Sequence, residues 1–174
     1  VMFCGLDRPE YFWCCLIEKA YAKLTGSYDH IVGGYEDAAM ADLTGGIPSK
    51  MTNLRDNQNE MWSSLLAARR NGDLLGAGSL SGSDTDKNDQ GVVLGHAYSI
   101  LDVRELEGHR LLQMRNPWGT GEWTGRWSDR STEWTPRYKK LLNYEDCDDG
   151  KFWISFEDFC SNYRTVYMCK MVQD

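Results

Sequence analysis

The sequence lacks a hydrophobic run of membrane-spanning length, because no apolar stretch approaches the roughly 20 residues that a transmembrane helix requires. The opening residues, VMFCGLDRPE, lack the charged start and the long apolar centre of a secretory signal peptide. Basic residues are also few: 19 Lys and Arg stand against 26 Asp and Glu, for a formal net charge of −7. Phosphate binding relies on a basic face, so we expect no nucleic-acid partner. Because no apolar run is long enough, we also expect no transmembrane segment.

The spacings of common metal sites are missing as well. The three histidines have no paired-ligand spacing and no C-x-x-C occurs, which argues against zinc. The acidic stretch DTDKNDQG (84–91) resembles the start of an EF-hand, but that loop needs a glutamate at its twelfth position. Counting from Asp84 or Asp86 places Gly95 or Ala97 there. The segment is therefore predicted to be a polar, mobile loop.

The six cysteines do not form the pattern of a disulfide framework. Cys14 and Cys15 are adjacent, and the others are scattered through apolar or acidic segments. Such usage is typical of reduced thiols in a cytosolic protein, so a cytoplasmic location is expected.

The sequence does contain enough hydrophobic residues to form a core. With 174 residues, 41% hydrophobic residues and seven tryptophans, it suits one ordinary domain, or one domain and part of another. Helical patterns come first, and short β-like runs follow from Leu74 onward. We therefore predict an α+β fold, with a largely antiparallel sheet or barrel in its second part. The predicted helices cover 7–27 and 57–72, and the predicted strands cover 74–80, 92–103, 109–116, 151–159 and 164–172.

The first predicted helix has a broad apolar face. Pro9 suits its first turn and Gly26 its end. Apolar residues recur every four positions and are flanked by others, which predicts that this face is buried. The residues concerned are Phe12, Trp13, Leu16, Ile17, Ala20, Tyr21 and Leu24.

Two glycines and a proline mark the best candidate for a boundary between lobes. Gly45, Gly46 and Pro48 end a glycine-containing loop segment. We predict one lobe, incomplete in this chain, over residues 1–45 and a second, β-rich lobe over 46–174. In the second predicted helix, Asn57 and Glu60 have capping-box spacing and Gly72 stands at the stop.

Two apolar runs end in chemically capable residues, His96 and Asn116. A histidine titrates near physiological pH and can act as a general base when a second group fixes its ring. A neutral asparagine suits this role beside a thiolate, because the thiolate already balances the imidazolium charge. Taken alone, however, such a pair is more often a satisfied core histidine and a turn former before Pro117.

Several segments, taken together, resemble the calpain family of calcium-dependent, papain-like cysteine proteases. The resemblance covers nearly the whole chain in the right order, and its motifs are long and rich in tryptophan. The matching segments are FWCCLIEKAYAKLTGSY (12–28), DLTGG (42–46), GHAYSI (95–100), RNPWG (115–119), EWTGRWSDRSTEW (122–134) and DDGKFWISFEDF (148–159).

The resemblance implies a papain-like protease core in which His96 is the catalytic base and Asn116 orients it. Trp118 would wall the site, and Gly95 would leave room beside His96 for substrate backbone. The nucleophilic cysteine of papain-like enzymes lies roughly 130–150 residues before the histidine, which here falls before residue 1. Residues 1–45 would then be the helical tail of a cysteine-bearing lobe, and this chain alone is expected to be inactive toward polypeptide substrates.

The resemblance also implies calcium. Its ligands would be side chains of Glu122, Asp129 and Asp149 with the backbone carbonyl of Cys147, an oxygen set that suits this ion. The family usually has a further acid two residues after Asp149, where this chain has Lys151. A lysine ammonium repels calcium if it points into the site. Glu18 matches a ligand of a second calcium site, whose other ligands would lie in the absent lobe.

Two other functions stay open from the sequence. One is a pseudo-protease that has lost the upstream cysteine and binds or scaffolds partners. The other is a calcium-responsive binding module with the Trp-rich segment as its recognition surface. The 79–91 loop is likewise either a gate beside the substrate cleft or an ordinary exposed connection.

Overall fold

A computed structural model describes residues 12–172 of the chain. The predicted role of Pro9 lies outside these residues. Contacts divide the chain into two compact units, Val1–Tyr35 and Glu36–Asp174. This division follows the density of contacts, and the lobe boundary predicted at 45/46 stays a prediction.

The first unit contains α1 (Trp13–Thr25) and the 3-10 turn η1 (Tyr28–Ile31). Gly26 ends α1 as predicted, with a positive φ of 109°. The prediction that one broad face of this helix is buried is wrong for the described residues. Leu16 is 55% exposed and Leu24 is 72% exposed, because a single helix and a short turn supply too little apolar surface to enclose them.

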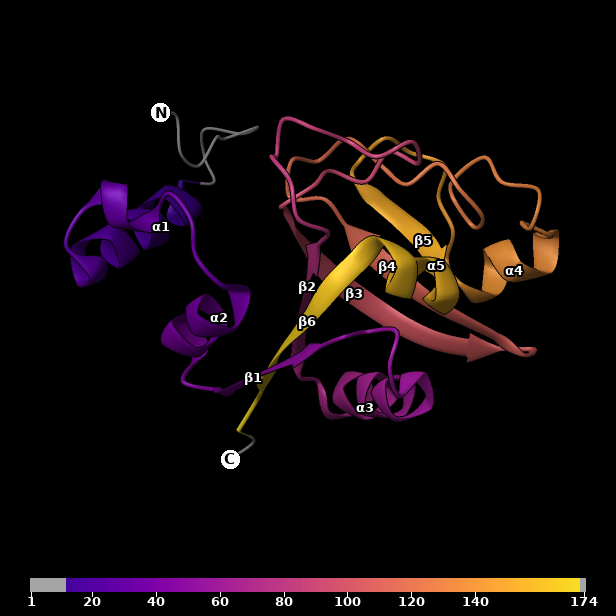
Figure 1. Ribbon diagram of the computed structural model, residues 1–174, viewed down its shortest axis with the longest axis horizontal. Helices are drawn as coiled ribbons and strands as arrows, with labels where there is room; N and C mark the ends of the chain where they lie inside the picture. The colour runs from indigo at the N-terminus through magenta and orange to yellow at the C-terminus, as the bar shows by residue number, and fades with distance from the viewer. Residues whose placement is uncertain (1–11, 173–174) are drawn as a thin grey trace. The chain divides into compact units, whose positions relative to one another are not determined.

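The second unit is built on a six-stranded sheet in which every pairing is antiparallel, as the sequence predicted. The spatial order of the strands is β1-β6-β2-β3-β4-β5 (Figure 1). The elements are α2 (Glu36–Thr44), β1 (Ile47–Thr52), α3 (Gln58–Asn71), β2 (Leu74–Ser79), β3 (Ala97–Leu106), β4 (His109–Arg115), α4 (Pro136–Leu141), β5 (Lys151–Ser155), α5 (Phe156–Asn162) and β6 (Tyr163–Lys170).

Three local predictions need correction. The strand expected from residue 92 begins at Ala97, and β1 was not predicted at all. The run expected as one strand over 151–159 divides after Ser155, whose side chain accepts a hydrogen bond from the Asp158 N–H and so starts α5. The capping box at Asn57 and Glu60 does not form, because Asn57 has a left-handed backbone and makes no side-chain cap.

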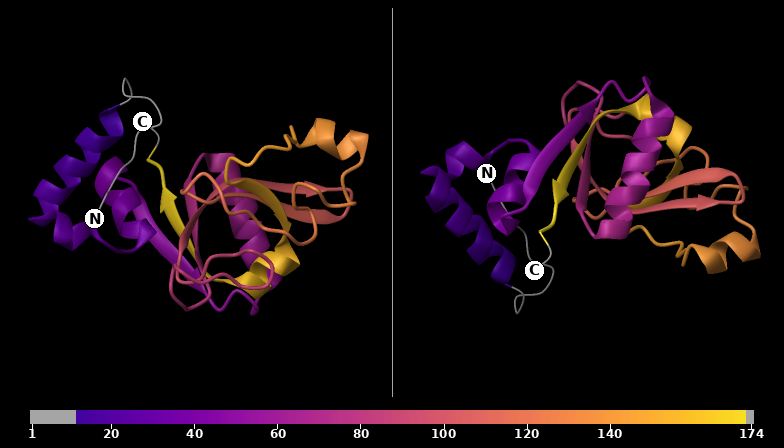
Figure 2. Two further views of the ribbon diagram at one scale, coloured as in Figure 1. Left: turned by 90° about the horizontal axis from the view of Figure 1, so that it is seen from above. Right: turned by 90° about the horizontal axis from the view of Figure 1, so that it is seen from below.

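The main core fills the space between α3, α5 and the sheet. α3 contributes Trp62 and Leu65, and the strands contribute Ala77, Leu112 and Val166, all fully or almost fully buried. A smaller cluster of three tryptophans packs on β4 and β5 near α4, which lies at the opposite end of this unit from β1 (Figure 2). Two apolar clusters therefore hold the sheet rigid from both sides.

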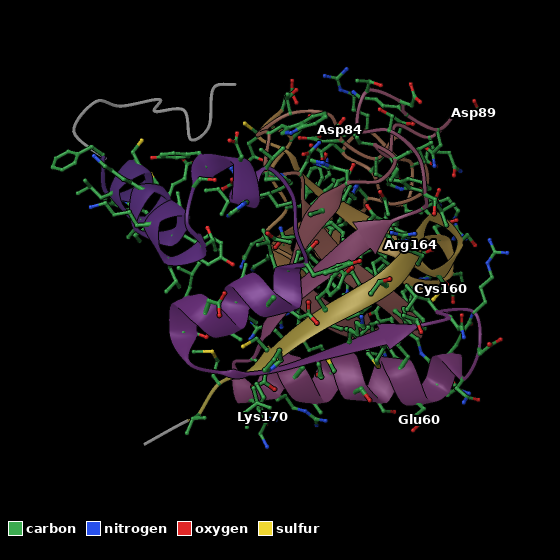
Figure 3. All side chains as sticks on the ribbon, turned by 60° about the vertical axis from the view of Figure 1, so that its left-hand side comes forward. Glu60, Asp84, Asp89, Cys160, Arg164 and Lys170 are labelled. Atoms are coloured by element: carbon green, nitrogen blue, oxygen red, sulfur yellow. The ribbon has the colours of Figure 1, made fainter. Side chains whose placement is uncertain are left out.

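The long loops of this unit gather at one end of the sheet. Residues 80–96 and 116–135 meet beyond the start of β3 and the end of β4 (Figure 1). The Thr124 N–H donates to the Gln90 carbonyl at 3.0 Å, which ties the two loops together. Figure 3 labels Asp84 and Asp89 on the first of these loops, and Glu60 of α3 at the opposite end of the view. None of the described helices is long and apolar enough to cross a membrane.

Candidate active site

The sheet brings His96 and Asn116 together. His96 stands immediately before β3 and Asn116 immediately after β4. β3 and β4 pair antiparallel with Ser99 opposite Arg115, so the start of one strand lies beside the end of the other. His96 Nε2 lies 3.0 Å from Asn116 Oδ1. Two residues 20 positions apart thus form one hydrogen-bonded pair.

The side chain of Asn116 is fixed in one orientation. It is completely buried, and its Nδ2 donates to the Gly121 carbonyl at 3.0 Å. Its Oδ1 accepts from the Trp118 N–H at 3.1 Å. These two contacts require that the oxygen, not the nitrogen, faces His96. Since this oxygen only accepts, Nε2 of the imidazole is the donor, and Nδ1 of the neutral ring carries the free lone pair.

The backbone of His96 is clamped by Ser79 at the end of β2. The Ser79 hydroxyl accepts from the His96 N–H at 2.9 Å and donates to the His96 carbonyl at 3.2 Å. The Ser79 N–H donates to the same carbonyl at 3.0 Å. Ser79 is almost fully buried, and sequence analysis missed it because a serine closing an apolar strand carries no distinctive signal.

Aromatic rings shield the pair. The Trp118 ring lies 4.4 Å from the His96 ring, centroid to centroid, and is half exposed. Tyr98 approaches the other side edge-on at 5.1 Å. The indole therefore covers the imidazole on its solvent side and limits the access of water to the Asn116 hydrogen bond.

Gly95 is required by the backbone itself. Its φ is +55°, and a Cβ built there would lie 2.3 Å from the Gly82 carbonyl oxygen. Its N–H donates to the Leu80 carbonyl at 2.7 Å. The loop thus passes directly beside Gly95, which gives this glycine a structural reason, and its predicted role toward substrate backbone stays a prediction.

The three predicted calcium carboxylates lie close enough to influence one another. Partial burial and then the negative charge of Glu122 raise the pKa of Asp129 to about 6, with further contributions from Asp146 and Asp149. Burial also raises the pKa of Glu122. Glu122, Asp129 and Asp149 therefore share one neighbourhood, and their role as calcium ligands stays a prediction.

These carboxylates already have partners within the protein. Glu122 Oε1 accepts from the N–H groups of Asp149 and Gly150, at 3.1 and 2.8 Å. The Lys151 ammonium lies 2.8 Å from Asp149 Oδ2, and the Lys151 N–H donates to Asp149 Oδ1 at 2.9 Å. Partial burial acts to raise the pKa of Asp149, but the hydrogen bonds and charge of Lys151 outweigh it and leave this pKa below its usual value.

This arrangement does not fit a calcium ion. No group of three or more His, Cys, Asp or Glu side chains among the described residues could hold a metal. The ammonium of Lys151 lies among the acids that a cation would need. Cys147, the predicted carbonyl ligand, is exposed in the same loop. Glu18, the predicted ligand of a second site, lies in α1 of the other unit.

One glycine connects the acidic loop to the candidate active site. The Gly150 carbonyl accepts from the Asn116 N–H at 2.8 Å, while its own N–H binds Glu122. Its φ is +80°, and a Cβ there would lie 2.7 Å from the Asn116 carbonyl oxygen. The position of the 145–151 loop is therefore transmitted directly to the backbone of Asn116.

The buried thiol of Cys160 is not suited to be a nucleophile. Cys160 lies in α5, and burial raises its pKa to about 12. A thiol with this pKa is almost entirely protonated at neutral pH, whereas the thiolate is the reactive form. Cys160 is therefore a packing residue of the core.

Comparison with known proteins identifies a family. A family model described as calpain family cysteine protease matches residues 1–170. The chain is 47% identical over 177 residues to the calpain-type cysteine protease DEK1 of Zea mays, and 48% identical over 178 residues to that of Arabidopsis thaliana. It is 38% identical over 184 residues to calpain-8 of Rattus norvegicus. These matches cover 97%, 97% and 100% of the chain, which spans only 8%, 8% and 26% of the relatives' lengths.

Proposed function

The chain belongs to the calpain family of cysteine proteases, and we propose that it supplies the catalytic histidine and asparagine of a cysteine endopeptidase. The observation that carries this proposal is the hydrogen bond between His96 Nε2 and Asn116 Oδ1. A core histidine needs only some partner, whereas this imidazole is held by a fully buried amide with its Nδ1 left available.

The geometry supports a division of labour in peptide hydrolysis. A cysteine thiolate attacks the carbonyl carbon of the scissile bond, and the C–N bond then breaks. The leaving amine takes the proton that His96 Nδ1 carries, so a neutral amine departs and an acyl-thioester remains. His96 next accepts a proton at Nδ1 from water, whose oxygen attacks the thioester carbon. The C–S bond then breaks, which releases the carboxylic acid product and restores the cysteine thiolate beside the protonated imidazole. Asn116 keeps Nε2 protonated and the ring in place throughout.

The nucleophile of this scheme lies outside the described residues. We propose that it belongs to an upstream cysteine-bearing lobe, of which residues 1–45 form the helical tail, while residues 46–174 form the His/Asn lobe. The exposed apolar residues of α1 support this, since they need further chain to bury them. The 174-residue chain alone is therefore expected not to cleave its polypeptide substrates.

Calcium has no step in this proposal. The family resemblance implies calcium dependence, and the acids needed for a site are near one another, but Lys151 and backbone N–H groups occupy them. We propose that the Lys151 ammonium takes over the neutralising role of a cation in this loop. The thiols of Cys147, Cys160 and Cys169, which form no disulfide, support a cytoplasmic location as a further part of the proposal.

The test is peptide cleavage by a longer protein that includes the upstream lobe, measured with calcium, with a chelator, and in the His96→Ala variant. The proposal expects turnover that His96→Ala lowers by at least about a hundredfold, since general acid–base catalysis contributes about 10²–10⁴. Equal turnover with calcium and with chelator would support the proposal that the Lys151 ammonium replaces a bound cation. A folded protein without turnover would favour the pseudo-protease or the binding module, and unchanged cleavage in His96→Ala would overturn the catalytic role of His96.

A further inference from the structure

An apolar pocket adjoins the His96–Asn116 pair within the second unit. Its volume is about 320 Å³, and it lies between α2, β2 and the start of β3. Ala97 and Pro117, the residues that directly follow His96 and Asn116, both line it. Most of its remaining wall is apolar, from Met40, Leu43 and Leu74. Any group in this pocket is therefore next to the proposed reaction centre.

One carboxylate lies in this apolar surrounding. Glu36, the first residue of α2, lines the pocket, and its Oε1 is buried with no hydrogen-bond partner among the described residues. Its other oxygen lies against Gly76, where a Cβ would come within 1.7 Å of Oε2. Only a glycine in β2 leaves room for this carboxylate, so the strand and the acid fit each other.

No cationic side chain among the described residues neutralises Glu36. None of the ion pairs among the described residues includes it. Its charged neighbour is another acid, Asp37, and the phenol of Tyr167 also interacts with it. Burial and then the negative charge of Asp37 raise the pKa of Glu36 to about 7, although a hydrogen bond from the Tyr98 N–H acts to lower it. An ionised carboxylate without a counter-ion is unfavourable in such surroundings, and a bound cation removes that penalty.

We infer that this pocket is a substrate subsite in which Glu36 selects a side chain with an apolar stem and a cationic end, that of arginine or lysine. The inference rests on the proposed protease function, because the occupant is a residue of the polypeptide substrate. The methylene stem packs on the apolar wall while the charged end reaches the carboxylate. A charge-assisted hydrogen bond to the Glu36 carboxylate then satisfies Oε1, which has no partner among the described residues.

Citrulline provides the sharpest test, because it has the shape of arginine without the charge. Peptides of one sequence, each with arginine or citrulline at one position in turn, are offered to the longer protein that carries this chain. Binding is measured by fluorescence anisotropy in a His96→Ala background, which prevents turnover, and cleavage is measured with His96 present. We expect one position at which arginine is preferred over citrulline by roughly tenfold in both readouts.

The variant Glu36→Gln keeps the size of the side chain and removes its charge. It should abolish the preference for arginine at that position, while Asp37→Asn, the matched control on the same turn of α2, should keep it. Thermal unfolding of each variant shows whether the fold is intact. The comparison of arginine with citrulline on the unsubstituted pocket needs no variant and tests the inference even if Glu36→Gln does not fold.

The outcomes separate the two proposals. Equal binding of arginine and citrulline peptides at every position, no binding of the arginine peptides, or a preference that survives Glu36→Gln would each overturn the subsite. A Glu36-dependent preference in binding, with no peptide cleaved, would remove the protease function and retain the selective pocket. Cleavage without a preference for arginine over citrulline would retain the protease function and remove the selective pocket.

Discussion

The Lys151 ammonium lies 2.8 Å from the Asp149 carboxylate, at a place where the family resemblance predicts calcium. A second acid, Glu145, lies 3.9 Å from the same ammonium. The loop therefore contains its own cation, fixed by the covalent chain. Because Gly150 links this loop to Asn116, the role proposed for Lys151 implies that the geometry of the candidate active site does not depend on the calcium concentration.

Replacement of this lysine by an acid should create calcium binding. In Lys151→Glu the ammonium is lost and one more carboxylate joins Glu122, Asp129 and Asp149. We expect calcium at a hundredfold excess over its Kd to raise the free energy of unfolding by about 2.7 kcal/mol in this variant. The unsubstituted chain should show little change. Differential scanning calorimetry with calcium and with chelator measures both.

Lys140→Glu is the matched control, since it makes the same charge reversal on an exposed residue of α4. Equal calcium responses of the two variants would show a general charge effect. A strong calcium response of the unsubstituted chain would contradict the role assigned to Lys151.

The amide of Asn116 should matter for stability as well as for turnover. Asn116→Ala removes the acceptor for His96 and Trp118 and leaves the partly buried Gly121 carbonyl without its donor. We expect a loss of about 1–3 kcal/mol in unfolding free energy, measured by urea titration. In the longer protein kcat should fall by about a hundredfold or more with KM little changed. An unchanged kcat would remove Asn116 from the mechanism.

Ser79 is predicted to be a positioning residue for His96. Ser79→Ala removes the hydroxyl that both accepts from the His96 N–H and donates to its carbonyl. We expect about 1–2 kcal/mol less stability and a kcat that falls more than KM rises. Ser63→Ala, at an exposed site on α3, is the control. Restoration of kcat by Ser79→Thr, which keeps the hydroxyl, would separate positioning from packing.

The pH dependence of stability should reveal Glu36. Its pKa is raised in the folded state from 4.5 to about 7, so between these values the folded protein holds a proton that the unfolded chain has released. The contribution of Glu36 to stability is thus fully present below about pH 4.5, declines as pH rises, and is lost above about pH 7. The full decline is about 3–4 kcal/mol.

Glu36→Gln cannot titrate and should not show this part of the decline. The difference in unfolding free energy between the two proteins is measured at intervals from pH 4 to 8. It isolates Glu36 from other raised groups such as Asp129, which contribute equally to both. Asp84→Asn, on the exposed loop, is the control. A difference that stays constant across this range would show that Glu36 titrates normally.

The sequence was sufficient for the α+β class, the antiparallel pairing, the stop at Gly72 and the family. Periodicity and turn residues act locally, and a run of matching motifs carries a family's identity without coordinates. It failed at Asn57, where spacing suggested a cap that the backbone conformation does not allow. It also failed on α1, where an apolar stripe predicted burial but says nothing about which surface covers it.

The pairing of His96 with Asn116 was predicted from the resemblance, yet only the tertiary structure decided which atoms meet. The register of β3 on β4 sets Nε2 against Oδ1, and Gly121 fixes the amide orientation. Likewise, the sequence showed a lysine among acids, and the fold placed its ammonium on Asp149. Glu36 carried no signal in the sequence, because an acid at a helix start is ordinarily solvated. Its burial against Gly76 depends on two segments 40 positions apart that only folding brings together.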